Sequence, residues 1–319
     1  IQGQDPRGAR LAIRARSSGL TAADVDRALG ERALLITWLC RGTLHLVRRE
    51  DYPWLHALTA PRLLTGNTRR LTQEGVSAAA AERGVGVIER SLAREGPLTR
   101  PQLRERLDTA GVPTAGQALV HLLMLASLRG LSVRGPMLGG EHAHVLVHDW
   151  LGAAAQTERE HALTGAGRAG ALAELARRYL AGHGPADERD LARWAGITLR
   201  DARAGLQAIA AELAPRGHGL VALARATAAP ALPPPRLLGA FDPVLLGWST
   251  REPILGPHTR IVTVNGLFRP FALADGRAVA IWSMAKGQVK IEPLGRISGA
   301  VNTALHDEAR DVERYLRPG

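Results

Sequence analysis

A phrase of Gly, Pro and an aliphatic residue occurs twice in the chain, each time between two predicted helices. It reads Gly96-Pro97-Leu98 in one place and Gly184-Pro185-Ala186 in the other. Each copy is preceded by a helical segment and followed by a short helix, a longer helix and strand-like residues. Shared turns together with a shared order of elements indicate an internal repeat, and this order is typical of a winged helix.

Helix caps and periodicity define the elements of the two copies. Thr99 with Gln102 three positions later forms a capping-box pattern, and Thr198 is a good N-cap residue. In the first of these copies we predict helices over 78–92, 101–107 and 114–129, and strands over 131–133 and 144–147 joined by a Gly-rich loop over 135–140. In the other copy we predict helices over 168–180, 187–194 and 198–212, and a strand over 220–224.

The N-terminal residues show a similar order of predicted elements, whereas the C-terminal residues are predicted to be rich in β-strands. Helices are predicted over 5–17, 22–29 (capped by Thr21 with Asp24) and 33–39, before a strand over 43–47. After a Pro/Ala-rich linker over 228–235, strands are predicted over 237–248, 261–264, 268–273, 277–282 and 289–293, with turns at Asn265-Gly266 and Asp275-Gly276 and a last helix over 301–316.

The chain is therefore expected to be an α+β protein with three tandem winged helices and a β-rich C-terminal domain. We place the winged helices at 1–75, 76–152 and 153–227, and the C-terminal domain with its closing helix at 236–319. A length of 319 residues fits several domains rather than one.

Charge favours a polyanionic partner. The formal net charge is +11, and all but Lys286 and Lys290 of the 41 basic residues are arginine. Arginine enrichment fits a phosphate-binding surface, since guanidinium forms paired hydrogen bonds to phosphate. It also fits a GC-rich genome, and composition alone does not separate the two explanations. Nucleic acid remains the expected partner of so basic a chain.

Several classes of protein are disfavoured. No apolar run reaches the roughly 18 residues that span a bilayer, and no secretory signal is visible, so we expect a cytoplasmic monomer without membrane contact. The single cysteine, Cys40, has apolar neighbours and is interpreted as a packing residue rather than a nucleophile. His142 and His144 are interpreted as a solvated strand face rather than metal ligands, so we expect neither metal nor cofactor.

Two constellations remain open. Arg41-Gly42-Thr43-Leu44-His45 either bonds to neighbouring backbone on one strand face, or presents Arg41 to phosphate and His45 to a pocket. Asp242 either serves catalysis, as carboxylates near a sugar do, or is a buried partner of Arg251, which we favour.

Several phrases together resemble the AlkZ-like DNA glycosylases, the family of the azinomycin B resistance glycosylase. The resemblance begins at Gln2-Gly3-Gln4-Asp5-Pro6 and covers essentially the whole chain. Further phrases are Ala15-Arg16, the run from Trp38 to Val47, Asp51-Tyr52-Pro53-Trp54, Leu98-Thr99-Arg100, Arg177-Arg178-Tyr179-Leu180, His183-Gly184-Pro185-Ala186, Trp194-Ala195-Gly196, Phe241-Asp242, Leu245-Leu246-Gly247 and Arg251.

The resemblance implies winged helices around a concave DNA channel and monofunctional cleavage of the N-glycosidic bond of N7-alkylguanine. Some members also unhook interstrand crosslinks and protect producers of DNA-alkylating antibiotics. The two glutamines of the family motif correspond to Gln2 and Gln4, with Gly3 where a larger apolar residue is usual. Glutamine is no general base, but N7-alkylation already gives the leaving base a positive charge. Two amide carbonyls could therefore hold the attacking water and face the oxocarbenium-like sugar.

The expected partner is double-stranded DNA carrying alkylated guanine. The alternative function is a non-catalytic winged-helix DNA-binding protein, a regulator or a lesion-sequestering protein, because winged helices are more often readers than enzymes. Candidate DNA contacts are Arg10, Arg14, Arg41, Thr43, His45, Arg48, Arg49, Arg69, Arg70 and Arg100.

Overall fold

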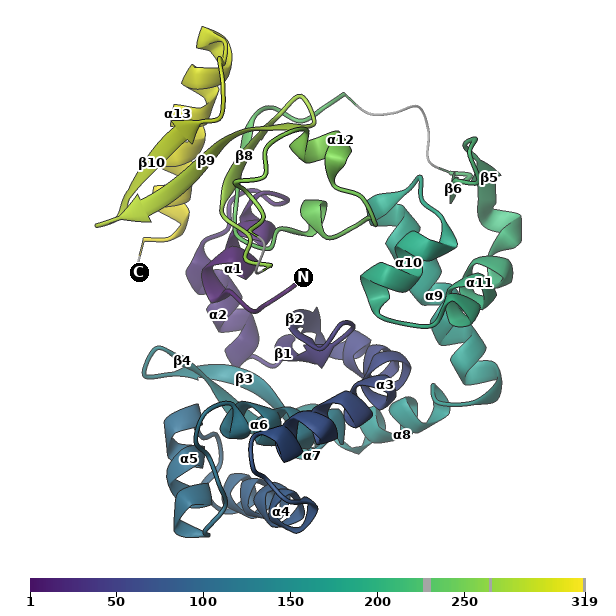
Figure 1. Cartoon of the computed structure of the whole chain (residues 1–319), viewed down its shortest axis with the longest axis vertical. Helices are drawn as coiled ribbons and strands as arrows, with labels where there is room; N and C mark the ends of the chain where they lie inside the picture. The colour runs from purple at the N-terminus through teal and green to yellow at the C-terminus, as the bar shows by residue number, and fades with distance from the viewer. Residues whose placement is uncertain (226–230, 264–265, 318–319) are drawn as a thin grey trace. The chain divides into compact units, whose positions relative to one another are not determined.

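The computed structural model describes residues 1–225, 231–263 and 266–317. The chain forms two compact units, and each unit takes segments that lie far apart in the sequence (Figure 1). Unit 1 comprises Ile1–Val25, Tyr179–Trp194 and Ala211–Gly319, and unit 2 comprises Asp26–Arg178 and Ala195–Ala210. None of the helices in the described ranges is long and apolar enough to cross a membrane.

Unit 2 is built around an antiparallel sheet with the strand order β2-β1-β3-β4. Its strands are β1 (Leu34–Leu39), β2 (Thr43–Arg48), β3 (Ser132–Leu138) and β4 (Glu141–Leu146). Its helices are α3 (Tyr52–Gln73), α4 (Ala78–Glu95), α5 (Arg100–Thr109), α6 (Ala118–Leu128), α7 (Val147–Leu151), α8 (Ala153–His161) and α11 (Leu199–Ala208), with most of α9 (Gly165–His183). The sheet takes strands from both sides of residue 75, and the division into four domains stays a prediction.

The helix predicted over 33–39 is wrong, because these residues form β1. Every residue of β1 from Leu35 to Leu39 is buried, so both faces of the strand are covered. A strand buried on both faces reads as a continuous apolar run, which periodicity cannot distinguish from a buried helix. The predicted loop over 135–140 is also mostly strand, since β3 runs to Leu138 and only Gly139 and Gly140, both with positive φ, make the turn.

The repeated Gly-Pro phrases have the same structural role in both copies. Leu98 follows α4 and exchanges two backbone hydrogen bonds with His144 of β4, at 3.1 and 2.7 Å. Ala186 follows α9 and exchanges two with Val221 of β6, at 3.0 and 2.9 Å. In each copy two helices and a β-hairpin follow: α5, α6 and β3–β4 in the first, and α10 (Glu188–Ala195), α11 and β5 (Leu213–Pro215)–β6 (Val221–Leu223) in the second.

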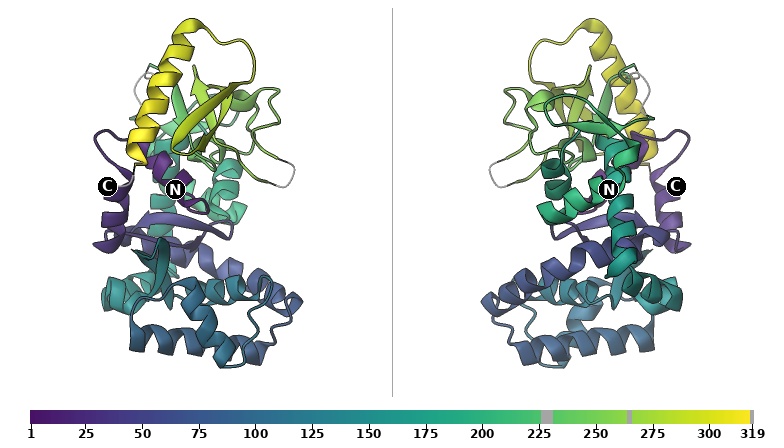
Figure 2. Two further views of the ribbon diagram at one scale, coloured as in Figure 1. Left: turned by 90° about the vertical axis from the view of Figure 1, so that its left-hand side faces the viewer. Right: turned by 90° about the vertical axis from the view of Figure 1, so that its right-hand side faces the viewer.

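Unit 1 contains the second antiparallel sheet, with the order β10-β9-β8-β7. Its strands are β7 (Arg236–Leu238), β8 (Phe271–Ala274), β9 (Arg277–Ala285) and β10 (Gln288–Pro293). Helix α13 (Gly299–Tyr315) packs against β7 and β10. Figures 1 and 2 show α13 along the sheet, beside β10. Helix α1 (Pro6–Arg14) contributes Leu11 to the core that Leu237, Trp282 and Tyr315 form. Helix α2 (Ala22–Gly30) crosses the boundary of the two units.

The C-terminal prediction is correct for β8–β10, for the Asp275-Gly276 turn and for the last helix. The strand predicted over 237–248 is wrong beyond Leu238, because Phe241 has a φ of 57° and a 3-10 turn over Pro243–Leu245 follows, before helix α12 (Glu252–Leu255). The strand predicted over 261–264 is reduced to a single bridge between Val262 and Phe268. Val264 and Asn265, and part of the predicted linker over 228–235, lie outside the described residues.

Candidate active site and DNA contacts

The glutamine pair lies in unit 1, directly before helix α1. Gln2 Nε2 donates a hydrogen bond of 2.9 Å to Gln4 Oε1. The side chain of Gln2 is buried, whereas Gln4 is exposed. Because a carbonyl oxygen has two lone pairs, Gln4 Oε1 can accept a second donor beside the Gln2 amide. The pair therefore presents one oriented amide carbonyl to solvent rather than two independent ones.

The chain turns into α1 immediately after the pair, and the turn is capped. Asp5 is the N-cap residue, and its Oδ1 accepts a hydrogen bond of 3.0 Å from the backbone nitrogen of Arg7. Pro6 occupies the first helical turn, where its missing N–H costs nothing. The position of the glutamines is thus tied to the position of α1.

Helix α1 lies against the segment that follows β7 at a distance only glycine permits. A Cβ added to Gly8 would lie 2.4 Å from the carbonyl oxygen of Ala240. A Cβ added to Gly239 would lie 2.9 Å from the Gly8 Cα. Real Cβ atoms essentially never come so close to backbone, so any side chain here would push α1 away.

An ion pair anchors the end of α1 to the same segment. Asp242 is fully buried, and its two oxygens accept hydrogen bonds from Arg16, at 3.0 and 2.7 Å. Asp242 Oδ1 also accepts from the backbone nitrogen of Val244 at 2.9 Å. Asp242 is buried as predicted, but the predicted partner Arg251 is wrong, because the ion pair that the structure describes is with Arg16. Arg251, the predicted partner, donates from Nε to the Leu245 carbonyl at 2.7 Å and lies over the Phe268 ring.

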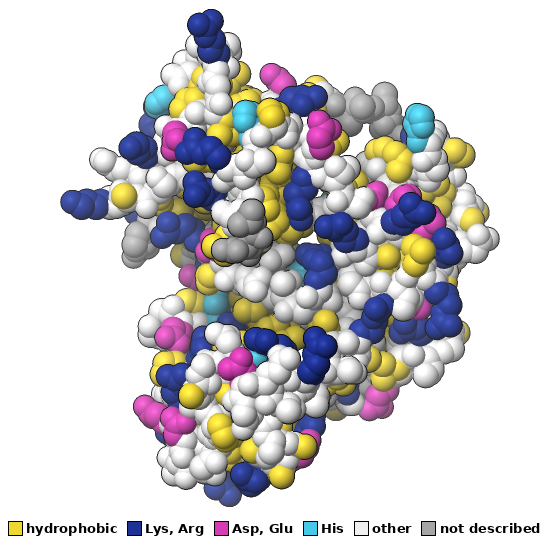
Figure 3. Space-filling view, viewed as in Figure 1, with side chains coloured by type: hydrophobic (Ala, Val, Ile, Leu, Met, Phe, Trp, Pro, Cys, Tyr) yellow, Lys and Arg dark blue, Asp and Glu magenta, His cyan; other side chains and the backbone are white. Residues whose placement is uncertain are grey.

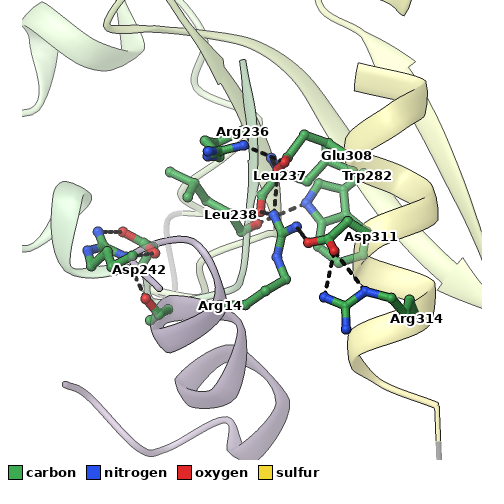
Figure 4. A network of polar contacts seen from close by, with 11 residues as sticks. Arg14, Arg236, Leu237, Leu238, Asp242, Trp282, Glu308, Asp311 and Arg314 are labelled. Carbon is green, nitrogen blue, oxygen red and sulfur yellow. Dashed lines mark hydrogen bonds and ion pairs between the residues drawn. The ribbon is translucent and has the colours of Figure 1, made fainter. Parts of the chain in front are cut away.

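A second anchor connects α1 to α13, and Figure 4 shows it closely. The Arg14 guanidinium bonds to Glu308, to Asp311 at 2.6 Å and to the Leu237 carbonyl at 3.2 Å. Glu308 is also bonded by Arg236 at 2.6 Å and by the backbone nitrogen of Leu237 at 3.1 Å. Only 4% of the Arg14 side chain is exposed. A buried guanidinium with two carboxylate partners has a structural role, which argues against the predicted contact between Arg14 and DNA.

Arg10, also on α1, was predicted to contact DNA, and its burial argues against that contact as well. It is 8% exposed, and its guanidinium donates to the Pro6 carbonyl at 2.9 Å. Its own backbone carbonyl accepts a hydrogen bond of 2.9 Å from the Tyr315 hydroxyl of α13. The helical period explains the error, because residues 10 and 14 share the face of α1 that packs on the core.

An aromatic cluster, which sequence reasoning missed, supports the segment that carries Asp242. Tyr179 stacks on His183 with ring centroids 5.1 Å apart, and Trp194 and Trp248 contact the same histidine. The Tyr179 hydroxyl donates to the Gly247 carbonyl at 2.6 Å, and Trp248 Nε1 donates to the His183 carbonyl at 2.9 Å. Burial lowers the pKa of His183 below its ordinary value. The four aromatic rings come from phrases that carried the family resemblance or lie next to them.

In unit 2, the structure favours the backbone-bonded interpretation of the Arg41–His45 segment. His45 is 9% exposed, and its Nδ1 donates to the Thr43 carbonyl at 2.9 Å. Burial lowers the pKa of His45 to about 3, so the ring is neutral at physiological pH. Thr43 Oγ1 is buried too, and it has no hydrogen-bond partner within the described ranges. Burial raises the pKa of Cys40 to about 11, which confirms the interpretation as a packing residue.

The other arginines predicted to contact DNA differ in whether they already form ion pairs or hydrogen bonds within the protein. Arg48 pairs with the exposed Glu50 at 3.1 Å and with the buried Asp51 at 3.2 Å. Arg70 bonds to Gln73 at 2.9 Å on the surface, where such a contact is weak. Arg49 donates to the Leu151 carbonyl at 3.0 Å. Arg69 and Arg100 are exposed and form no ion pair within the described residues. Figure 3 shows Lys and Arg side chains spread over the viewed face.

His142 and His144 were wrongly expected on a solvated face, since His144 is 0% exposed.

Comparison with known proteins decides the family. A family model described as "DNA glycosylase AlkZ-like" matches residues 1–315. The chain belongs to the AlkZ-like DNA glycosylase family. It is 25% identical over 334 residues to the "Interstrand DNA cross-link repair glycosylase" of Streptomyces sahachiroi, covering 98% of this chain and 87% of that protein. The solved structure of the Streptomyces sahachiroi DNA glycosylase AlkZ is similar with a TM-score of 0.76 and 24% identity, over 99% of this chain and 88% of that one.

Membership of this family makes the chain an enzyme that acts on N-glycosyl bonds in DNA. The structural likeness supports the mixed fold of helices and antiparallel sheets described above. Neither finding assigns a role to an individual residue.

Proposed function

We propose that this AlkZ-like glycosylase hydrolyses the N-glycosidic bond of N7-alkylguanine in DNA, with Gln2 and Gln4 at the reacting centre. The observation that carries the proposal is the 2.9 Å hydrogen bond that orients Gln4, on a segment held by a capped and doubly anchored helix. Preorganised dipoles stabilise developing charge without reorganising during the reaction. The anchors explain how the segment before α1 keeps a defined geometry.

The chemistry follows from the charge of the leaving group. N7-alkylation makes the base cationic, so it departs as a neutral molecule and needs no proton donor. The sugar becomes oxocarbenium-like, and the carbonyl oxygen of Gln4 carries partial negative charge toward it. The same oxygen can accept a hydrogen bond from the attacking water, while Gln2 fixes the rotamer of Gln4. The water oxygen bonds to the sugar carbon as the bond to the base breaks, and the surplus proton passes to solvent. Ordinary guanine would leave as an anion, and a neutral amide pair does not assist that departure.

DNA binding is assigned to the repeated modules. We interpret the order α4, Leu98 bridge, α5, α6, β3–β4 as one winged helix, and the order α9, Ala186 bridge, α10, α11, β5–β6 as another. The exposed arginines Arg69 and Arg100 are the strongest remaining phosphate contacts of the predicted set. Arg41, Arg48, Arg49 and Arg70 follow, whereas Arg10 and Arg14 are withdrawn.

The proposed substrates include bulky adducts and interstrand crosslinks. The proposed biological role is DNA repair and self-resistance against a DNA-alkylating natural product. The support is the name of the Streptomyces sahachiroi relative, a cross-link repair glycosylase. The likeness to that protein covers nearly the whole chain.

The test is release of free base from duplex DNA carrying N7-methylguanine or a bulky N7 adduct. Wild-type protein should release the base, and Gln4→Ala should lose most of that activity. Gln207→Ala, an exposed glutamine on α11, is the matched control and should behave as wild type. Equal release by the double variant Gln2→Ala, Gln4→Ala would refute the catalytic assignment. Salt-dependent binding without any base release by wild type would favour the non-catalytic DNA-binding alternative.

A further inference from the structure

Arg134 occupies an unusual position in the sheet of unit 2. It lies directly opposite His144 in the β3–β4 pairing, and His144 is bridged on its other side by Leu98. Neighbouring strands lie about 4.8 Å apart, so these three residues stand abreast across the sheet. Arg100 comes two residues after Leu98, as the first residue of α5. Arg134 lies on an inner strand, between β1 and β4, and the charge of Arg100 acts on it from the start of α5, so two arginines of separate segments lie near one another.

The guanidinium of Arg134 has no anionic partner in the part of the chain that the structure describes. It stacks over the Trp38 ring at 4.8 Å from the centroid, and its Nε is buried without a hydrogen-bond partner. Burial and the charge of Arg100 lower the pKa of Arg134 to about 10, against a smaller opposite effect of Glu141. Arg134 thus remains charged at neutral pH. A charge held in a poorly solvated position without a counter-ion costs stability.

Glu141 is the one described residue whose negative charge acts on Arg134, and its effect is smaller than that of burial and of Arg100. His144 is 0% exposed, and both of its ring nitrogens lack hydrogen-bond partners among the described residues. Burial and the charge of Arg134 keep the pKa of His144 well below its ordinary value, so the ring is neutral. Arg100 is exposed and forms no ion pair with any residue in the described ranges. The positive end of the α5 helix dipole is next to Arg100 and disfavours a cation there.

We propose that Arg134 and Arg100 form a binding site for a backbone phosphate of DNA, with Trp38 as the platform that orients Arg134. The inference rests on the proposed function for its choice of ligand. Stacking on an indole leaves the edge of a guanidinium available for paired hydrogen bonds, which match two oxygens of a phosphate. Arg100, whose charge acts on Arg134, supplies the rest of the complementary charge. The cost of holding Arg134 without a partner in the free protein is then recovered when DNA binds.

The experiment measures binding to undamaged duplex DNA over a series of salt concentrations. Arg134→Met places an uncharged, unbranched side chain beside Trp38, and Arg100→Gln removes the exposed charge. Each should weaken binding and reduce the slope of log K against log salt by about 1, while Arg134→Lys should keep the wild-type slope. Arg106→Gln is the control on the same helix, because Arg106 is already paired with Glu95 at 2.8 Å, and it should leave the slope unchanged.

Thermal unfolding of the free protein separates this role from a structural one. Removing an uncompensated charge should leave the Tm of Arg134→Met equal to or above that of wild type, although DNA binding is weaker. A lower Tm together with a wild-type salt slope would overturn the proposal, as would a wild-type slope for Arg100→Gln. Undamaged DNA requires no catalysis, so these results stand whether or not the glutamine pair cleaves the glycosidic bond.

Discussion

Gly8 offers the sharpest test of how the glutamine pair is positioned. Substitution Gly8→Ala puts a Cβ 2.4 Å from the Ala240 carbonyl oxygen, and an ordinary contact needs about 3.4 Å. The obstacle is backbone and cannot rotate away, so α1 must move by roughly 1 Å. Misplacing a reacting group by about 1 Å costs on the order of 100-fold in rate. We therefore expect Gly8→Ala to lower kcat/KM for base release by about 100-fold, with overpacking of about 1–3 kcal/mol in stability.

The assay is release of N7-methylguanine under single-turnover conditions, with folding checked by thermal unfolding at the assay temperature. Gly182→Ala in α9 is the matched control in unit 1, because nothing lies within 4 Å of its added Cβ, and it should retain full activity. Folded Gly8→Ala with wild-type activity would refute the argument that α1 positions the glutamines. Loss of activity in Gly182→Ala as well would show that the effect is unspecific.

Three further predictions concern buried groups. Glu308→Gln leaves Arg14 with one carboxylate and should destabilise unit 1 by about 3 kcal/mol, or roughly 6–12 °C in Tm by calorimetry, and a wild-type Tm would contradict it. The ring of His45, with a pKa of about 3 in the folded protein against about 6.5 unfolded, should show no NMR titration between pH 5 and 8. Between pH 6.5 and 3 the His45 ring binds a proton in the unfolded chain but not in the folded protein. The contribution of His45 to the free energy of unfolding should therefore fall by about 1.4 kcal/mol per pH unit as the pH drops through this range. The decrease should be smaller in His45→Gln. Cys40, with its pKa raised to about 11, should react with iodoacetamide at pH 8 only after denaturant is added, and rapid alkylation of the native protein would show that it is accessible.

Local signals predicted much of the secondary structure. The capping pairs at Thr99 and Thr198 start α5 and α11 as expected, since an N-cap depends on residues within one turn. Helix α3 was missed because Pro53, Pro61 and Gly66 interrupt its pattern, and His56 and Asn67 are polar although buried. Tertiary contacts overcome those local preferences: His56 bonds to the Ser127 carbonyl and Asn67 to that of His121, both in α6.

Sequence patterns alone indicate much of the order of elements, the repeat marked by Gly96-Pro97 and Gly184-Pro185, the likeness to a glycosylase family and the candidate pair Gln2 and Gln4. Each of these depends on residues a few positions apart or on a phrase read in order. Which charges are available to a ligand depends on how distant segments pack. Arg14 meets Glu308 across 294 positions and Arg16 meets Asp242 across 226, so no local pattern reveals these pairs. An arginine's role depends on its burial and its partner, and both are set when distant segments pack together.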